Sequence, residues 1–328
     1  MHSRFLIFTD LHVDMMHDTP IRAEVISRAV KEAKVDFVVQ LGDLMYPDEA
    51  FLKEHSPHSL GIMKEVRPWA VGRDDERFSV LASLENTGVP VYHTLGNHDM
   101  HICDKETMVK FLNMPGRFYD FVWGGVRFVV LDTNFVMTDE GVLADISCGS
   151  GAGQPGDKLK FLTEEQLVWL EKTVMESREP CVLFSHASLA DPLSGIRNRQ
   201  EFFALIDRVN RDQKRILAAF NGHSHIDGMR MYGGTAFINI NSASYHWMGG
   251  DYECIRYSEK MSACYPRIKR TAPYHAPLYA IVDVEDEKIR IKGTKSLFVG
   301  KTPQELGLPR EENDFDPCAM IRSRTIKL

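Results

Sequence analysis

The chain is organised around a segment that reads Val89-Pro90-Val91-Tyr92-His93-Thr94-Leu95-Gly96-Asn97-His98-Asp99. Residues 89–95 are mostly β-branched, aromatic or apolar, a composition that predicts a strand. Gly96 permits a sharp backbone turn where that strand ends. An amide oxygen, an imidazole and a carboxylate then follow in one short loop, at Asn97, His98 and Asp99. This tetrad predicts a polar site at the end of a buried strand.

Four other segments place polar side chains directly after a short apolar run. They are Asp10-Leu11-His12, Gly42-Asp43, Ser185-His186 and Gly222-His223-Ser224-His225. Each segment alone is also compatible with an ordinary turn whose side chains face water. Because all five follow apolar runs in one sequence, we expect them to meet at a single site.

The composition is that of an ordinary globular chain. It has 328 residues, of which 44% are hydrophobic and 26% charged, enough for one large α/β domain or two modest ones. The net charge of −7 argues against a protein that wraps a nucleic-acid backbone. The six cysteines form no CxxC pair, and the sequence shows neither a signal-peptide pattern nor a membrane-spanning apolar run. We therefore expect a cytoplasmic protein without a membrane or nucleic-acid partner, and a secreted form with its leader removed is the alternative.

The chain begins with a strand, a helix and a second strand, at residues 4–8, 19–33 and 35–41. Thr19 as N-cap and Pro20 in the first turn mark the helix start. This βαβ unit implies a parallel pair, with Asp10 and Asp43 at the carboxyl ends of its strands, where ligands bind. Further strands are predicted at residues 117–121, 126–131, 181–184, 215–220, 235–240, 278–284 and 288–293. Further helices are predicted at residues 78–87, 106–112, 163–174 and 199–209.

We expect a single domain over residues 1–300 that carries three insertions. These insertions lie at residues 44–80, 135–160 and 244–277, and residues 301–328 are expected to be a peripheral tail. Residues 135–160 are predicted to be loop-like. Within them, the glycine-rich residues 149–156 have P-loop spacing, but Asp157 stands where the lysine of a P-loop would be. We therefore predict a flexible surface loop there.

The donor set points to transition metals. Its members carry carboxylate, imidazole and amide donors: Asp10, His12, Asp43, Asn97, His186, His223 and His225. Mixed nitrogen and oxygen donors suit Mn, Fe or Zn better than Mg or Ca. Seven ligands exceed the need of one ion and fit two, with Asp43 as the bridge because it lies between the two groups in sequence. His98 then stands outside the ligand set and suits proton donation to a leaving group.

The order of these motifs resembles that of the calcineurin-like metallophosphoesterase superfamily over residues 5–245. The resemblance implies a four-layer α/β/β/α sandwich of mixed sheets, with the site at the sheet edges. It also implies that one metal is held by Asp10, His12, Asp43 and His225, and the other by Asp43, Asn97, His186 and His223. By the same resemblance, His98 contacts the phosphate and protonates the leaving group, and Asp99 orients His98.

Within the superfamily, the Asp-x-His and Asn-His-Asp motifs are most similar to those of the cyclic-nucleotide and glycerophosphodiester phosphodiesterases. Two features differ from related patterns. Tyr46 stands where purple acid phosphatases carry a metal-bound tyrosine, but those enzymes lack the histidine found here at His12, so Tyr46 is expected to line the pocket. The fourth motif reads Ser185-His186-Ala187-Ser188 instead of a His-x-Pro form, which leaves the local substrate contact open.

These observations predict an enzyme with two metal ions that hydrolyses a small phosphodiester or phosphomonoester, nucleotide-like or glycerophosphodiester-like. A metal-bridging hydroxide would attack phosphorus in line. Candidate pocket residues are Tyr46, His101, Tyr245, His246 and Trp247.

One alternative is a binding or scaffold protein that uses the same fold without catalysis, and such a protein would be expected to have lost ligands. The other is a nuclease, which would be expected to show a basic groove. Substrate, metal identity and oligomeric state stay open.

Overall fold

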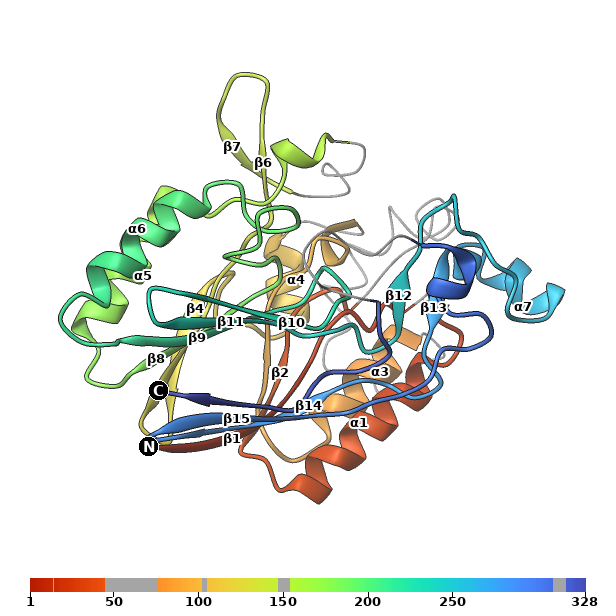
Figure 1. The fold of residues 1–328 in the computed structure, drawn as a ribbon, viewed down its shortest axis with the longest axis horizontal. Helices are drawn as coiled ribbons and strands as arrows, with labels where there is room; N and C mark the ends of the chain where they lie inside the picture. Colours follow the sequence, from red (N-terminus) through yellow and green to blue (C-terminus); the bar gives the residue numbers. More distant parts are fainter. Residues whose placement is uncertain (14, 45–75, 102–104, 147–153, 309–316) are drawn as a thin grey trace.

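The computed structural model describes residues 1–13, 15–44, 76–101, 105–146, 154–308 and 317–328. Two six-stranded mixed sheets lie face to face, with helices on their outer sides (Figure 1). This arrangement of layers is the one expected from the sequence. Tyr46 and most of the glycine-rich loop lie outside the described residues.

The first sheet joins the two ends of the chain. Its strand order is β16-β15-β14-β1-β2-β3. The parallel strands are β1 (His2–Phe8), β2 (Phe37–Gln40) and β3 (Val91–His93). Antiparallel pairing then adds β14 (Ala280–Glu285), β15 (Lys288–Gly293) and β16 (Arg324–Lys327). The predicted βαβ unit and the predicted antiparallel pair are therefore confirmed.

The second sheet has the order β10-β11-β9-β8-β5-β4. Its four central strands run parallel: β5 (Val126–Val130), β8 (Cys181–Ser185), β9 (Ile216–Asn221) and β11 (Thr235–Asn239). The edge strands β4 (Tyr119–Trp123) and β10 (Gly228–Tyr232) are antiparallel. All six residues of β9 are buried, as expected for a strand covered on both faces.

Aromatic side chains fill the space between the sheets. The ring of Phe5 on β1 contacts three rings of the second sheet, those of Phe128, Phe184 and Phe220, at centroid distances of 5.6, 5.7 and 6.1 Å. Phe5 also stacks on Phe37 of the neighbouring strand β2 at 5.1 Å. Edge-to-face and stacked ring pairs stabilise such an interior beyond their buried area. This aromatic core fixes how the two sheets lie against each other.

Helices cover the outer faces of both sheets. α1 (Thr19–Ala33) and α3 (Glu76–Glu85) pack together beside the first sheet. α5 (Glu164–Glu176) and α6 (Arg199–Val209) pack together beside the second, over a separate apolar cluster (Figure 1). The shorter α4 (Lys105–Phe111) follows the loop after β3. The Thr163 side chain caps α5 by accepting a hydrogen bond from Gln166 N.

Three segments differ from the expectations. Residues 135–160 were expected to be loop-like, but they contain a two-stranded sheet of β6 (Phe135–Met137) and β7 (Leu143–Asp145). The exposed carboxylate of Asp145, on β7, lies 2.9 Å from the buried ammonium of Lys105. Strands of only three residues carry too little pattern to predict. β10 was also not predicted. In the tail, β16 pairs with β15 as an edge strand.

One local detail also differs from the expectations. The helix α1 begins at Thr19, and the capping position is Asp18, whose carboxylate pairs with Arg22 instead of the helix N–H groups. Residues 244–277, expected to be an insertion, lie outside the two six-stranded sheets. They form the separate pair β12 (Tyr245–Trp247) and β13 (Thr271–Pro273) and the short helix α7 (Glu259–Cys264). This excursion lies on the side of the molecule opposite the two chain ends (Figure 1).

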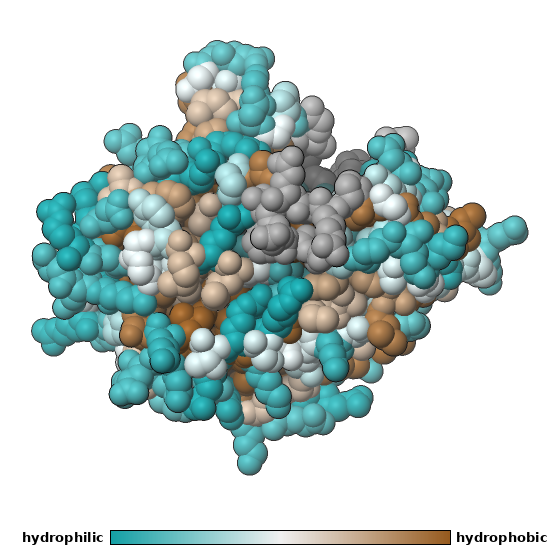
Figure 2. All heavy atoms as spheres, viewed as in Figure 1, coloured by the Kyte–Doolittle hydropathy of each residue, from teal (hydrophilic) through white to brown (hydrophobic). Residues whose placement is uncertain are grey.

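Figure 2 shows hydrophilic residues over most of the visible face, with apolar residues scattered between them, as on ordinary globular surfaces. In the described part of the chain, no helix is long and apolar enough to cross a membrane. The described cysteines, Cys181, Cys254, Cys264 and Cys318, form no disulfide.

Candidate metal centre

Every predicted ligand follows the carboxyl end of a parallel strand. Asp10 and His12 follow β1, Asp43 follows β2, and Asn97 follows β3. In the second sheet, His186 follows β8, and His223 and His225 follow β9. Because parallel strands end at the same edge of a sheet, each sheet gathers its own ligands, and the packed sheets bring the two sets together.

The backbone at these positions is unusual. Five of the predicted ligands have positive φ angles, between 51° and 69°: Asp10, His12, Asp43, His223 and His225. Residues with a Cβ rarely adopt this left-handed region, and strained residues of this kind concentrate at functional sites. The sharp turns re-aim the side chains from the strand direction toward a common point.

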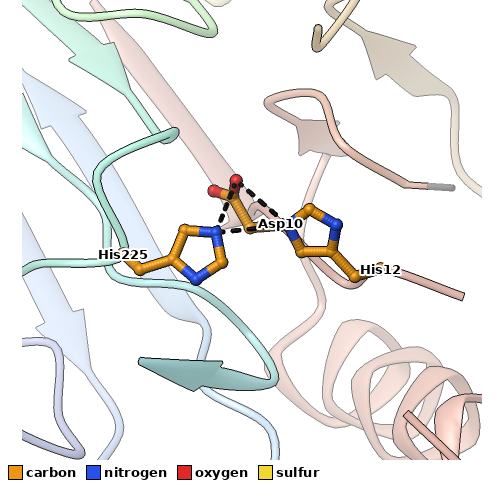
Figure 3. Close-up of side chains that lie close together, drawn as sticks. All are labelled: Asp10, His12 and His225. Carbon is orange, nitrogen blue, oxygen red and sulfur yellow. Dashed lines mark hydrogen bonds and ion pairs between the residues drawn. The ribbon is translucent and has the colours of Figure 1, made fainter. Parts of the chain in front are cut away.

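The first ligand group is Asp10, His12 and His225, all buried (Figure 3). His225 Nε2 lies 3.2 Å from Asp10 Oδ1 and 3.2 Å from His12 Nε2. The other His225 nitrogen, Nδ1, donates to the carbonyl of Tyr245 at 2.9 Å. That bond places the ring proton on Nδ1 and leaves the Nε2 lone pair facing the other two ligands.

Hydrogen bonds orient Asp10 so that its Oδ1 faces the two histidines of the first ligand group. Its Oδ2 accepts hydrogen bonds from Thr9 Oγ1 at 2.6 Å and from His223 N at 3.0 Å. Its Oδ1 is buried and accepts no hydrogen bond from the described residues. Oδ1 and the Nε2 atoms of His12 and His225 face one another, and a metal cation would be a common partner for all three. The donor set therefore fits a metal ion.

The second ligand group is Asp43, His186 and His223. His186 Nε2 lies 3.2 Å from Asp43 Oδ2, from Asn97 Oδ1 and from His223 Nδ1. His186 Nδ1 donates to the carbonyl of Leu41 at 2.8 Å, which directs Nε2 inward in the same way as in the first group. The amide oxygen of Asn97 thus lies beside the second group. Its role as a metal ligand stays a prediction.

Asp43 lies between the two groups. Its Oδ2 is 3.2 Å from His186 Nε2 in one group and 3.8 Å from His12 Nε2 in the other. Its Oδ1 accepts a hydrogen bond from the backbone N–H of His98 at 2.8 Å. This position suits a carboxylate that bridges two ions, as expected from the order of the motifs.

The carboxylates and imidazoles of the two ligand groups shift one another's pKa values. Burial opposes ionisation of Asp10 and Asp43, but the neighbouring imidazoles hold the pKa of each carboxyl well below its usual range. Burial likewise opposes protonation of His186, but the carboxylate of Asp43 raises its pKa to about 9. Burial, followed by the charge of Lys160, holds the pKa of His223 well below its usual range. The protein without metal therefore keeps both carboxylates ionised.

His98 and Asp99 lie at the edge of the ligand groups. The His98 side chain is 25% exposed, and its Nε2 lies 4.0 Å from Asp43 Oδ2. Asp99 Oδ2 accepts hydrogen bonds from Gly96 N at 2.8 Å and from Asp43 N at 3.0 Å. Asp99 therefore ties the β3 loop to the β2 loop, a structural role that the sequence did not reveal. Its predicted role in orienting His98 stays a prediction.

Two glycines make this close approach possible. A Cβ on Gly96 would lie 2.1 Å from Asp43 N, and a Cβ on Gly42 would lie 2.6 Å from His186 Nδ1. Gly42 also has a φ of 96°. These backbones approach so closely that no side chain fits between them.

A cavity of about 320 Å³ opens over the ligands. Its lining includes three of the predicted pocket residues, Tyr245, His246 and Trp247. Of these residues, Trp247 is 41% exposed. Burial lowers the pKa of His246 to about 4, so this side chain is neutral near pH 7. The candidates Tyr46 and the side chain of His101 lie outside the described residues.

One basic residue beside the site was not predicted. Lys160 Nζ lies 3.3 Å from His223 Nε2. Burial lowers the pKa of this ammonium to about 8, so it is mostly charged at neutral pH. Lys160 lies in the segment expected to be loop-like and follows no apolar run, so no local sequence pattern singles it out.

The sequence matches the calcineurin-like phosphoesterase family over residues 3–227. No curated protein matches the chain. The fold is similar to that of a dimetal phosphatase from Danio rerio, with 16% identity, a TM-score of 0.59 and coverage of 90% of this chain and 98% of the other. It is also similar to a purple acid phosphatase from yellow lupin (Lupinus luteus), with 12% identity, a TM-score of 0.52 and coverage of 100% and 54%.

At these identities the two structures show the fold alone. The family match spans more than half of the chain and includes all five motifs. The predicted superfamily and its four-layer architecture are thereby confirmed. The chain belongs to the calcineurin-like phosphoesterase family, a family of metal-dependent phosphoester hydrolases.

Proposed function

We propose that the protein hydrolyses a small phosphodiester or phosphomonoester at two transition-metal ions. The observation that carries the proposal is the position of Asp43 between two ligand groups, 3.2 Å from His186 and 3.8 Å from His12. Asp10, His12, Asp43 and His225 would hold one ion. Asp43, Asn97, His186 and His223 would hold the other.

Two bound ions would lower the pKa of a water molecule and neutralise charge on the phosphoryl oxygens. The chain's own residues supply the rest. His98 is the proton donor for the leaving group, because its imidazole is close to Asp43 yet belongs to neither ligand group. The hydrogen bond from its backbone N–H to Asp43 Oδ1 couples its position to that of the bridge.

The size of the cavity supports the proposal of a small substrate. Its volume of about 320 Å³ suits a ligand of modest size. The walls formed by Tyr245 and the half-exposed Trp247 offer aromatic surface to an organic group on the phosphate. A nucleotide-like or glycerophosphodiester-like substrate is consistent with this combination of an ion-binding floor and an aromatic wall.

The proposal is tested by elemental analysis of protein purified without chelator, together with an esterase assay. Hydrolysis of nitrophenyl phosphate and of bis-nitrophenyl phosphate is measured with added Mn²⁺ for the wild type, Asn97→Ala and His98→Ala. We expect about two transition ions per wild-type chain and a loss of activity of 10²-fold or more in both variants. His98→Ala should keep its metal.

A matched control is His275→Ala, which removes an exposed histidine outside both ligand groups and should leave activity unchanged. The ratio of diester to monoester hydrolysis selects between the two substrate classes. A wild-type protein without bound metal that hydrolyses neither ester in the presence of Mn²⁺ would contradict the proposal and favour a non-catalytic binding protein.

A further inference from the structure

The outer nitrogens of the ligand imidazoles do not all have the same kind of partner. His186 and His225 each donate Nδ1–H to a backbone carbonyl, those of Leu41 and Tyr245. His223 is turned the other way. Its Nδ1 faces the ligand group, 3.2 Å from His186 Nε2, and its outer nitrogen Nε2 faces the ammonium of Lys160 at 3.3 Å.

The backbone holds Lys160 in place. Its N–H donates to the carbonyl of Phe135 at 3.0 Å, and its carbonyl accepts from Arg197 N at 2.9 Å. Its φ is 70°, an unfavourable value for a residue with a Cβ, which persists where the surroundings fix it. The side chain is therefore delivered to His223 from an anchored segment.

Once a metal ion binds to His223, the Lys160 ammonium and the His223 imidazole no longer form a donor–acceptor pair. An imidazole that gives its Nδ1 lone pair to an ion carries its proton on Nε2, so Nε2 becomes a donor. An ammonium has three donors and no acceptor. The two N–H donors, Lys160 Nζ and His223 Nε2, would then face each other at 3.3 Å. Without an acceptor that takes a hydrogen bond from both, this arrangement beside a metal ion costs free energy.

Among the described residues, the carboxylate whose charge acts on Lys160 has other partners. Asp191, whose charge acts on Lys160, accepts hydrogen bonds at Oδ1 from the backbone N–H groups of Leu193 and Ser194. Its Oδ2 faces Arg230 at 3.6 Å. The charge of Arg197 acts on Lys160 as well, so the surroundings favour an added anion.

We propose that Lys160 Nζ and His223 Nε2–H together bind a non-bridging oxygen of the substrate's phosphoryl group. This inference rests on the proposed function, because the acceptor is needed when His223 serves as a ligand. Lys160 is then a substrate-binding residue that recognises the phosphate oxyanion and not the organic group. It extends the site beyond the five motifs, into the segment after η2 (Gly156–Lys158).

The test measures binding of inorganic phosphate to the Mn²⁺-loaded protein by calorimetry, with the metal content determined on the same samples. In Lys160→Met, which keeps the aliphatic stem, we expect phosphate affinity to fall about tenfold, the factor for one charge-assisted hydrogen bond. The KM for bis-nitrophenyl phosphate should rise in parallel, with metal content unchanged. Lys160→Arg should restore most of the affinity.

The matched control is Lys158→Met, because the Lys158 ammonium lies two residues away and pairs with Asp139; its phosphate affinity should equal that of the wild type. Unchanged phosphate affinity in Lys160→Met would overturn the inference. Loss of metal in that variant would also overturn it, since Lys160 would then support His223 itself. In both cases an active wild type leaves the proposed function standing, whereas a metal-free, inactive wild type refutes both.

Discussion

At His186, a proton and a metal ion compete for the same nitrogen atom, Nε2. Its Nδ1 is committed to the Leu41 carbonyl, so only Nε2 remains for a proton or an ion. Burial opposes a proton there, but the Asp43 carboxylate 3.2 Å away raises the pKa of His186 to about 9. Without metal, His186 is therefore protonated at neutral pH, and metal binding must displace that proton.

This competition predicts a pH-dependent metal affinity. Below a pH of about 9 each bound ion at the second group releases one proton, so the apparent Mn²⁺ affinity should rise about tenfold per pH unit from 6 to 8. Competition with a chelator of known affinity measures it. His246→Gln should keep the slope, because burial lowers the pKa of His246 to about 4 and the residue is neutral throughout. An affinity that is flat over this range would contradict the prediction.

At the scale of elements, the last strand secures the loop that carries His225. Asp227, two residues after His225, is fully buried, and its carboxylate accepts hydrogen bonds from both Arg322 and Arg324. Arg324 belongs to β16 of the first sheet, and Asp227 immediately precedes β10 of the second. The C-terminal residues thus connect the two sheets beside the first ligand group.

Arg324→Ala should therefore destabilise the fold. The change leaves a buried carboxylate with fewer donors, which lowers the free energy of unfolding by about 1–3 kcal/mol. Urea denaturation of the metal-free protein measures it. The control is Arg290→Ala on β15, which removes an exposed pair with Glu285 and should change stability by less than about 1 kcal/mol. Equal effects in both variants would show that the Asp227 contact does not matter.

At the scale of the whole molecule, each sheet supplies only part of the centre. The first sheet provides Asp10, His12, Asp43 and Asn97, and the second provides His186, His223 and His225. The aromatic core around Phe5 sets the position of one sheet against the other. Bound ions would therefore act as cross-links between the sheets and stabilise only the folded state.

Metal should consequently raise the melting temperature. With free Mn²⁺ at 100 times its dissociation constant, the stabilisation is about 2.7 kcal/mol for one site, which corresponds to several degrees. Differential scanning fluorimetry with Mn²⁺ and with a chelator measures the shift. Asp43→Asn removes the charge of the bridging residue and should reduce the shift strongly. A wild-type melting temperature that does not respond to either addition would contradict the prediction.

The sequence alone determined the main strands and the residues at their ends. An apolar run followed by a glycine or a polar residue is a local signal, since buried strands need apolar side chains and tight turns need glycine. Local patterns of this kind sufficed for β1, β2, β8 and β9 and for the seven side chains that the structure brings together.

Only the tertiary structure decided the features that depend on partners distant in the sequence. The hairpin of β6 and β7 forms where Lys105 pairs with Asp145, β16 completes a sheet that begins at residue 2, and Lys160 meets His223 from 63 residues away. Short strands and single charged residues carry no periodicity of their own. Their positions follow from packing and charge pairing, which arise only once the two sheets have come together.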